Sequence, residues 1–256
     1  LVKYRYHFSG YSDSDGARWY GIESSVAAWH QYAFFTDNGG MLQCVDLNSM
    51  TLKYAVDTDG DGDAGVVIEE SADNNTIFLY AANKADGRNA ADGRDKAYIR
   101  KIDGRTGTVA WTKTFDASAE NAGGAYAPVH IGKNELNGTI IASLSTVALN
   151  GGTDGGLIIA LDKSTGEEKW RVEQADGIWS APVVIYDENG KGYILQCDRG
   201  GKLTLYSGID GQAMCSIDLG SRIESTPAVF NNTLVVGTRG VDGSGQGPKI
   251  VGIRIG

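Results

Sequence analysis

The sequence predicts an all-β fold, a β-propeller of about five four-stranded blades, as a single domain over residues 1–256. One observation is a hairpin that recurs with a fixed spacing, and a second is a strand start that recurs before each hairpin. A third is that no amphipathic stretch of helical period is long enough to compete. The 36 glycines against 4 prolines indicate many tight turns.

The recurring hairpin is clearest at residues 160–170, where an apolar strand end leads into a tight turn and a second strand carrying Trp170. Asp162 can accept hydrogen bonds from the backbone ahead of it, and Gly166 can adopt a positive φ. Large aromatic rings need a neighbour to cover them, so we expect the residue at this position to dock on packed structure. The same eight-residue step leads to four docking positions, which are Tyr54, Trp111, Trp170 and Cys215.

Each hairpin is preceded by a small polar residue, often with a proline, and then by an apolar run, as at residues 180–185. Short apolar segments separated by turn signals lie between each start and its hairpin. Each unit therefore holds about four strands in roughly 40 to 60 residues, the period of a propeller blade. We expect blade units at residues 22–57, 63–115, 124–173, 178–218 and 223–256.

The two ends of the chain complement each other in this pattern. The fifth unit stops where its outer strand should begin, and residues 2–8 resemble an outer strand with Tyr4 at the docking position. Two arrangements remain open. Either this displaced strand completes the last blade and closes a five-bladed ring, which would remove exposed sheet edges, or the chain is the C-terminal part of a longer propeller.

Composition excludes several functional classes. A net charge of -9 argues against nucleic acid or an anionic membrane surface as the main partner. No apolar run approaches the roughly 20 residues that span a bilayer, and no signal-peptide pattern opens the chain. The 3 histidines show no metal-binding spacing. The 3 cysteines are an odd number without a C-x-x-C pair, so we do not expect a disulfide scaffold.

Binding sites of propellers usually lie on the face built by two sets of loops. One set joins an outer strand to the next blade, and the other joins the two middle strands of a blade; both are long here and rich in Gly, Asp and Asn. Aromatic and cationic residues in these loops could receive a sugar ring or a partner side chain. They are Trp19, Tyr20, Tyr126, Trp179, Arg222 and Arg239. The alternative is that Tyr126 and Trp179, at strand entry points, pack between blades.

Residues 57–63 alternate aspartates with other residues, at Asp57, Asp59, Asp61 and Asp63. Oxygen ligands at alternate positions allow a short loop to wrap a calcium ion. Neither EF-hand register is complete: counted from Asp57, position twelve is Ile68, and counted from Asp59, Glu70 is twelfth but the glycine is missing. A calcium or other cation site and a solvated acidic turn both remain open. An ion would relieve the repulsion among the four carboxylates.

A family resemblance adds to these predictions. Residues 160–170 fit the A-x-D-x-x-T-G-x-x-x-W docking motif of quinoprotein-type (PQQ-like repeat) β-propellers at every fixed position, and residues 101–111 fit it with Lys101 in place of alanine. The chain also resembles uncharacterised PQQ-like propeller proteins of clostridia-type bacteria through residues 187–198 and 235–240. The resemblance implies tryptophan-docking blades, rings of seven or eight blades, and an extracytoplasmic bacterial protein, secreted or at the cell surface.

Two functional classes follow from the resemblance. The first is a non-catalytic scaffold whose long-loop face binds a protein, peptide or glycan, with calcium as a stabilising ion, similar in kind to the quinoprotein-type propeller that serves assembly at the bacterial outer membrane. The alternative is a PQQ-dependent dehydrogenase or a degenerate relative of one. Such dehydrogenases typically carry adjacent cysteines beside the quinone and close eight blades, and this chain has neither feature. We therefore expect a scaffold without catalytic residues and without bound PQQ.

Overall fold

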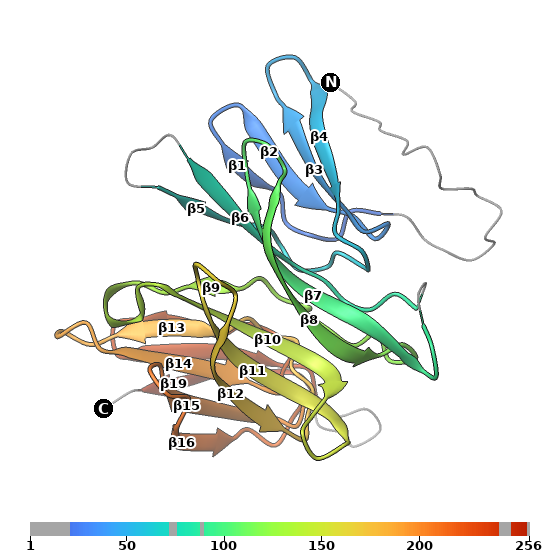
Figure 1. The fold of residues 1–256 in the computed structure, drawn as a ribbon. Coiled ribbons are helices and arrows are strands. Elements are labelled where there is room, and N and C mark those ends of the chain that lie inside the picture. Colours follow the sequence, from blue (N-terminus) through green and yellow to red (C-terminus); the bar gives the residue numbers. More distant parts are fainter. Residues whose placement is uncertain (1–20, 72–75, 88–89, 241–246, 255–256) are drawn as a thin grey trace.

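The structure is a computed structural model that describes residues 21–71, 76–87, 90–240 and 247–254 (Figure 1). Nearly all of its regular structure is antiparallel β-sheet; the helix within these residues is a single 3-10 turn, η2 (Asn134–Leu136). No helix in the described ranges is long and apolar enough to cross a membrane. The predicted all-β fold with about five blades is confirmed. Residues 2–8, with Tyr4, lie outside the described residues.

The strands of the described residues form five successive antiparallel units, which we number as blades 1 to 5; blades 2 and 3 belong to one eight-stranded sheet. Blade 1 consists of β1 (Ala27–Trp29), β2 (Tyr32–Thr36), β3 (Met41–Asp46) and β4 (Thr51–Asp57). Blade 2 consists of β5 (Val67–Glu70), β6 (Ile77–Ala82), β7 (Arg94–Asp103) and β8 (Val109–Ser118). Blade 3 consists of β9 (His130–Ile131), β10 (Thr139–Ala148), β11 (Asp154–Asp162) and β12 (Glu168–Gln174).

Blade 4 consists of β13 (Val183–Tyr186), β14 (Gly192–Cys197), β15 (Lys202–Ser207) and β16 (Ala213–Asp218). Within the described residues, blade 5 has three strands, β17 (Ala228–Phe230), β18 (Thr233–Thr238) and β19 (Lys249–Arg254). Within each blade, every strand pairs with the next in the chain, which is the up-and-down order of propeller blades. Blades 2 and 3 also touch through one pairing of β8 with β10, at Ala117 and Val147.

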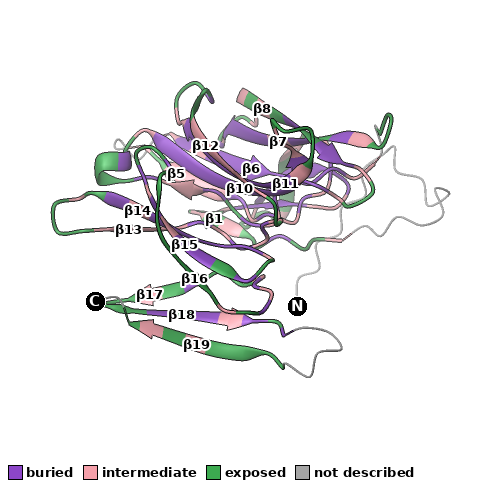
Figure 2. Ribbon diagram, turned by 90° about the horizontal axis from the view of Figure 1, so that it is seen from below, coloured by how far each residue is buried: buried purple, intermediate pink, exposed green. Residues whose placement is uncertain are grey.

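The hydrophobic core lies between successive blades. Between blades 1 and 2, for example, Phe34 and Leu42 pack with Ile77 and Leu79. Similar clusters join blades 2 and 3, 3 and 4, and 4 and 5. Middle strands such as β10 are buried on both faces because a blade covers each side, while β17 and β19 are largely exposed (Figure 2). This explains why the middle strands are apolar at nearly every position.

The docking positions make the same contact at three interfaces. The Tyr54 hydroxyl donates to the Gly104 carbonyl oxygen (2.8 Å), the Trp111 indole N–H to that of Lys163 (3.2 Å), and the Trp170 indole N–H to that of Gly208 (3.1 Å). Each ring thus lies under the hairpin turn of the next blade. In the described residues Cys215, the corresponding residue of blade 4, is an exposed free cysteine.

Candidate functional site

Two kinds of loop position meet on the long-loop face. One kind lies just before the first strand of a blade and provides Glu23, Asp63, Tyr126, Trp179 and Glu224. The other kind follows the second strand of a blade and provides Asn38, Lys84, Arg199 and Arg239. Because the strands of all blades run in the same alternating order, these loops gather at one end of the sheets. Side chains from different blades therefore contact one another there.

At blades 1 and 2 the contacts are acidic. Carboxylate oxygens of Glu23, Asp61 and Asp63, which we call the acidic cluster, all lie within 4.8 Å of one another. The ammonium of Lys84 lies 3.0 Å from an Asp61 oxygen and 2.6 Å from an Asp63 oxygen. Burial is the main cause that raises the pKa of Asp63; the hydrogen bond and charge of Lys84 oppose it, and the charge of Asp61 adds to it. One ammonium faces three carboxyl groups, so this end of the face is negative.

The structure divides the predicted calcium loop in two. Asp61 and Asp63 join Glu23, while Asp57 is exposed at the end of β4 and accepts a hydrogen bond from the backbone N–H of Asp59 (2.9 Å). The Asp59 carboxylate accepts a hydrogen bond from the Tyr98 hydroxyl (3.0 Å). The four aspartates are therefore not gathered around one point. Within the acidic cluster, the ammonium of Lys84 already supplies positive charge, and calcium binding stays a prediction.

An aromatic pair connects the acidic cluster to blade 4. The rings of Tyr126 and Trp179 stack with their centroids 4.5 Å apart and an angle of 16° between their planes. Lys84 places its ammonium 4.7 Å from the centre of the Tyr126 ring, and the Arg199 guanidinium lies 4.0 Å from the centre of the Trp179 ring. Both aromatic side chains are half-buried. Their stacking joins the loops that precede the first strands of blades 3 and 4, and it leaves part of each ring exposed at the surface.

At blades 4 and 5 three guanidinium groups share one carboxylate. Glu224 lies 3.3 Å from a nitrogen of Arg199, 3.3 Å from one of Arg239 and 3.8 Å from one of Arg222. The backbone N–H of Arg239 donates to the carbonyl oxygen of Arg222 (2.8 Å), which holds the two loops together. The side chains of Arg222 and Arg239 remain 42% and 51% exposed. We call Arg199, Arg222 and Arg239 the arginine cluster. Its three positive charges exceed the single negative charge of Glu224.

The structure therefore brings together four of the six residues predicted for the binding face, in two neighbouring groups. Tyr126 stacks on Trp179, and Arg222 and Arg239 meet at Glu224, whereas Trp19 and Tyr20 lie outside the described residues. Sequence reasoning missed Lys84 and Arg199, which connect these groups. A signal for Arg199 existed, because residues 37–40 and 198–201 are copies of one Asp-x-Gly-Gly turn that aligns it with Asn38.

Known proteins support the architecture. Residues 96–194 match the family model described as PQQ, the beta-propeller domain of glucose, ethanol and alcohol dehydrogenases. BamB from Moraxella catarrhalis is 14% identical with a TM-score of 0.57, and the match covers 93% of this chain and 63% of that one. The quinohemoprotein alcohol dehydrogenase from Comamonas testosteroni is 12% identical with a TM-score of 0.61, over 85% of this chain and 44% of that one.

The fold is that of the PQQ-type β-propellers. BBS1N in complex with ARL6DN is a further match, 10% identical with a TM-score of 0.57 over 91% of this chain and 64% of that one. The chain thus spans less than two thirds of each of these structures. No curated protein matches the sequence.

On the described part of the long-loop face, both rings of the aromatic pair already pack against other side chains. A flat cofactor needs an uncovered ring to stack on, but the Trp179 indole lies within stacking distance of both Tyr126 and Arg199, so one of them would have to move. Burial raises the pKa of the Cys44 thiol to about 11 and that of Cys197 to about 12, so both stay neutral.

Proposed function

We propose that this PQQ-type propeller is a non-catalytic binding module that holds a protein or peptide across its long-loop face. The observation that carries the proposal is a continuous row of contacts over the five blades, from the acidic cluster through Lys84, Tyr126 and Trp179 to the arginine cluster. Its aromatic and arginine side chains are of the kinds that are enriched at the energetic centre of protein interfaces, namely Tyr, Trp and Arg.

The charge of the row favours one orientation of the ligand. An acidic residue of a peptide can reach the exposed guanidinium groups of Arg222 and Arg239, where planar N–H donors suit a carboxylate. A basic residue would be drawn to the acidic cluster at the other end. Complementary charges at two ends fix the register and direction of a bound segment more than they raise its affinity.

Two further points belong to this proposal. BBS1N, which shares the fold, is in a complex with the protein ARL6DN, so a propeller of this kind has a protein partner there. We also propose an extracytoplasmic location for this chain, supported by the docking motifs that it shares with quinoprotein-type propellers. A glycan on the same aromatic pair is the competing ligand class.

A PQQ-dependent dehydrogenase is the second candidate, and the match of residues 96–194 to a dehydrogenase propeller model favours it. One assay distinguishes the binding module from the dehydrogenase, and the binding-module proposal predicts its outcome. Adding PQQ with calcium and an electron-accepting dye to the protein and alcohols should give neither a bound-quinone absorbance nor dye reduction. Dye reduction that depends on both PQQ and the protein would contradict the scaffold proposal.

Binding is tested directly with arrays of random peptides and of glycans. We expect the wild-type protein to select peptides with an acidic residue near an aromatic or apolar one, and Arg222→Glu with Arg239→Glu to lose this selection. The matched control is Lys133→Glu with Lys191→Glu, which makes the same charge change at two exposed positions, between β9 and β10 and between β13 and β14, and should keep this selection. Equal selection by both double variants, or selection of glycans alone, would overturn the proposal.

A further inference from the structure

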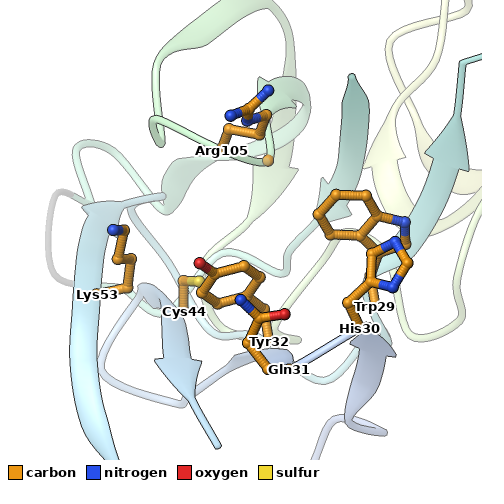
Figure 3. Close-up of a pocket in the computed structure, with 8 residues that line it drawn as sticks. Trp29, His30, Gln31, Tyr32, Cys44, Lys53 and Arg105 are labelled. Atoms are coloured by element: carbon orange, nitrogen blue, oxygen red, sulfur yellow. The ribbon is translucent and has the colours of Figure 1, made fainter. Parts of the chain in front are cut away.

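A second concave site lies away from the long-loop face, between blades 1 and 2. It is a cavity of about 320 Å³, near the lower limit of small-molecule sites. Its walls come from the turn between β1 and β2, from Lys53 in β4 and from the turn after β7, which contributes Gly104 and Arg105 (Figure 3). The long loops described above provide none of these residues. The cavity is therefore separate from the proposed partner face.

Aromatic side chains form one wall of the cavity. The rings of Trp29 and Tyr32 lie 6.4 Å apart and nearly parallel, with 17° between their planes. The Trp29 indole N–H donates to a carboxylate oxygen of Glu70 (3.0 Å), and the edge of the His30 ring contacts the indole at 4.3 Å between centroids. These contacts fix the orientation of Trp29. A flat or apolar ring of a ligand can pack against such a wall.

The rest of the lining is cationic or hydrogen-bonding. Figure 3 shows Lys53 across the cavity from Trp29, with Gln31 and Tyr32 between them and Arg105 above. No carboxylate lines the cavity within the described parts of the chain, although the protein carries a net charge of -9. Lys53 is exposed and forms no ion pair with any described residue. The Lys53 ammonium can therefore pair with an anion in the cavity.

The acidic residues at the start of the two adjacent turns are held by their own backbone. Asp46 accepts hydrogen bonds from the N–H groups of Asn48 (2.8 Å) and Ser49 (3.3 Å). In the same way, Asp103 accepts from the N–H groups of Arg105 (2.9 Å) and Thr106 (3.0 Å). These bonds use one carboxylate oxygen of each residue to stabilise its turn. Asp46 and Asp103 keep their negative charge, but they bond to their own turns and neither is among the residues that line the cavity.

We propose that this cavity binds a small ring compound that carries a carboxylate, with the ring against Trp29 and Tyr32 and the carboxylate at Lys53 and Arg105. A sugar acid and a single-ring aromatic acid share this chemistry and both suit the size of the cavity.

Isothermal titration with the full chain tests the proposal. The probes are glucuronate and benzoate, their neutral counterparts glucose and benzyl alcohol, and inorganic phosphate. We expect at least one of the two acids to bind with a dissociation constant of about 1 mM or below, and its neutral counterpart to bind at least about tenfold more weakly. Lys53→Gln should weaken acid binding by about tenfold, because it removes the charge that faces the ligand.

The control for Lys53→Gln is Lys191→Gln, which removes an exposed lysine that does not line the cavity. It should leave binding of the acids unchanged. A dissociation constant above about 1 mM for both acids, or acid binding that Lys53→Gln leaves intact, would overturn the proposal. If the neutral rings bind as tightly as the acids, the charge of the ligand does not contribute to binding. If phosphate binds as tightly as the acids, the ring of the ligand does not contribute. Either result would contradict the proposal.

Discussion

Gly166→Ala should destabilise the protein more than Gly152→Ala, although both glycines adopt nearly the same left-handed backbone. Their φ angles are +74° and +78°. A side chain in this region costs about 1–2 kcal/mol at either position. At Gly166, however, an added Cβ would lie 2.7 Å from the indole of Trp111, whereas at Gly152 it would meet nothing within 4 Å. Forcing an extra methyl group into packed structure costs about 1–3 kcal/mol more.

Urea unfolding at pH 7 measures this difference as a free energy, and thermal unfolding should show it as an additional fall of about 2–4 °C in Tm for each kcal/mol. A third comparison isolates the ring itself. In a Trp111→Leu background, the extra cost of Gly166→Ala should largely disappear, because the two positions are coupled through one contact. Equal destabilisation by the two alanines, or an extra cost that survives without the indole, would refute docking of blade 2 on the turn of blade 3.

Two further predictions concern charged groups. Lys84→Met leaves Asp61 and Asp63 without their ammonium, so the Tm of the variant should fall at pH 7. Calcium should restore part of this loss, whereas it should change the Tm of the wild type little. Equal stabilisation of both proteins by calcium would contradict this. Burial alone would raise the pKa of Glu69, but hydrogen bonds from Lys163 and Tyr80 hold it below its usual value. A lowered pKa means stability that is present above the unfolded-state pKa and lost as the pH falls, so the Tm deficit of Glu69→Gln should be largest near pH 7 and shrink below about pH 4. A deficit that is independent of pH would contradict this.

The fold was predictable because a repeat makes one local rule visible several times. The step from Asp162 to Trp170 depends only on the turn and the strand that follows it, and both are local in sequence. Four copies of that step fix the phase of the blades. The residue that each ring contacts was harder to predict from the sequence, since Trp170 contacts Gly208, which lies 38 residues further along the chain.

The site was only partly predictable, because its contacts join loops that are distant in sequence. Residues 57–63 look like one acidic group, but the left-handed backbone at Asp59 (φ 52°) and Gly60 (φ 95°) turns the chain between its halves. Asp61 and Asp63 thereby meet Glu23, about 40 residues earlier in the sequence. Lys84 was missed because its partners lie in a different loop, and spacing along the sequence carries no sign of such a meeting.

The central claim is that the long-loop face holds a protein segment on its aromatic pair and arginine cluster. Isothermal titration of the peptide that the wild type selects most strongly tests it most directly. Trp179→Ala and Arg222→Glu should each weaken binding by about tenfold or more, which is at least about 1.4 kcal/mol, and Lys133→Glu with Lys191→Glu should leave the affinity unchanged. Wild-type affinity in both face variants, or an equal loss in the control, would contradict the claim.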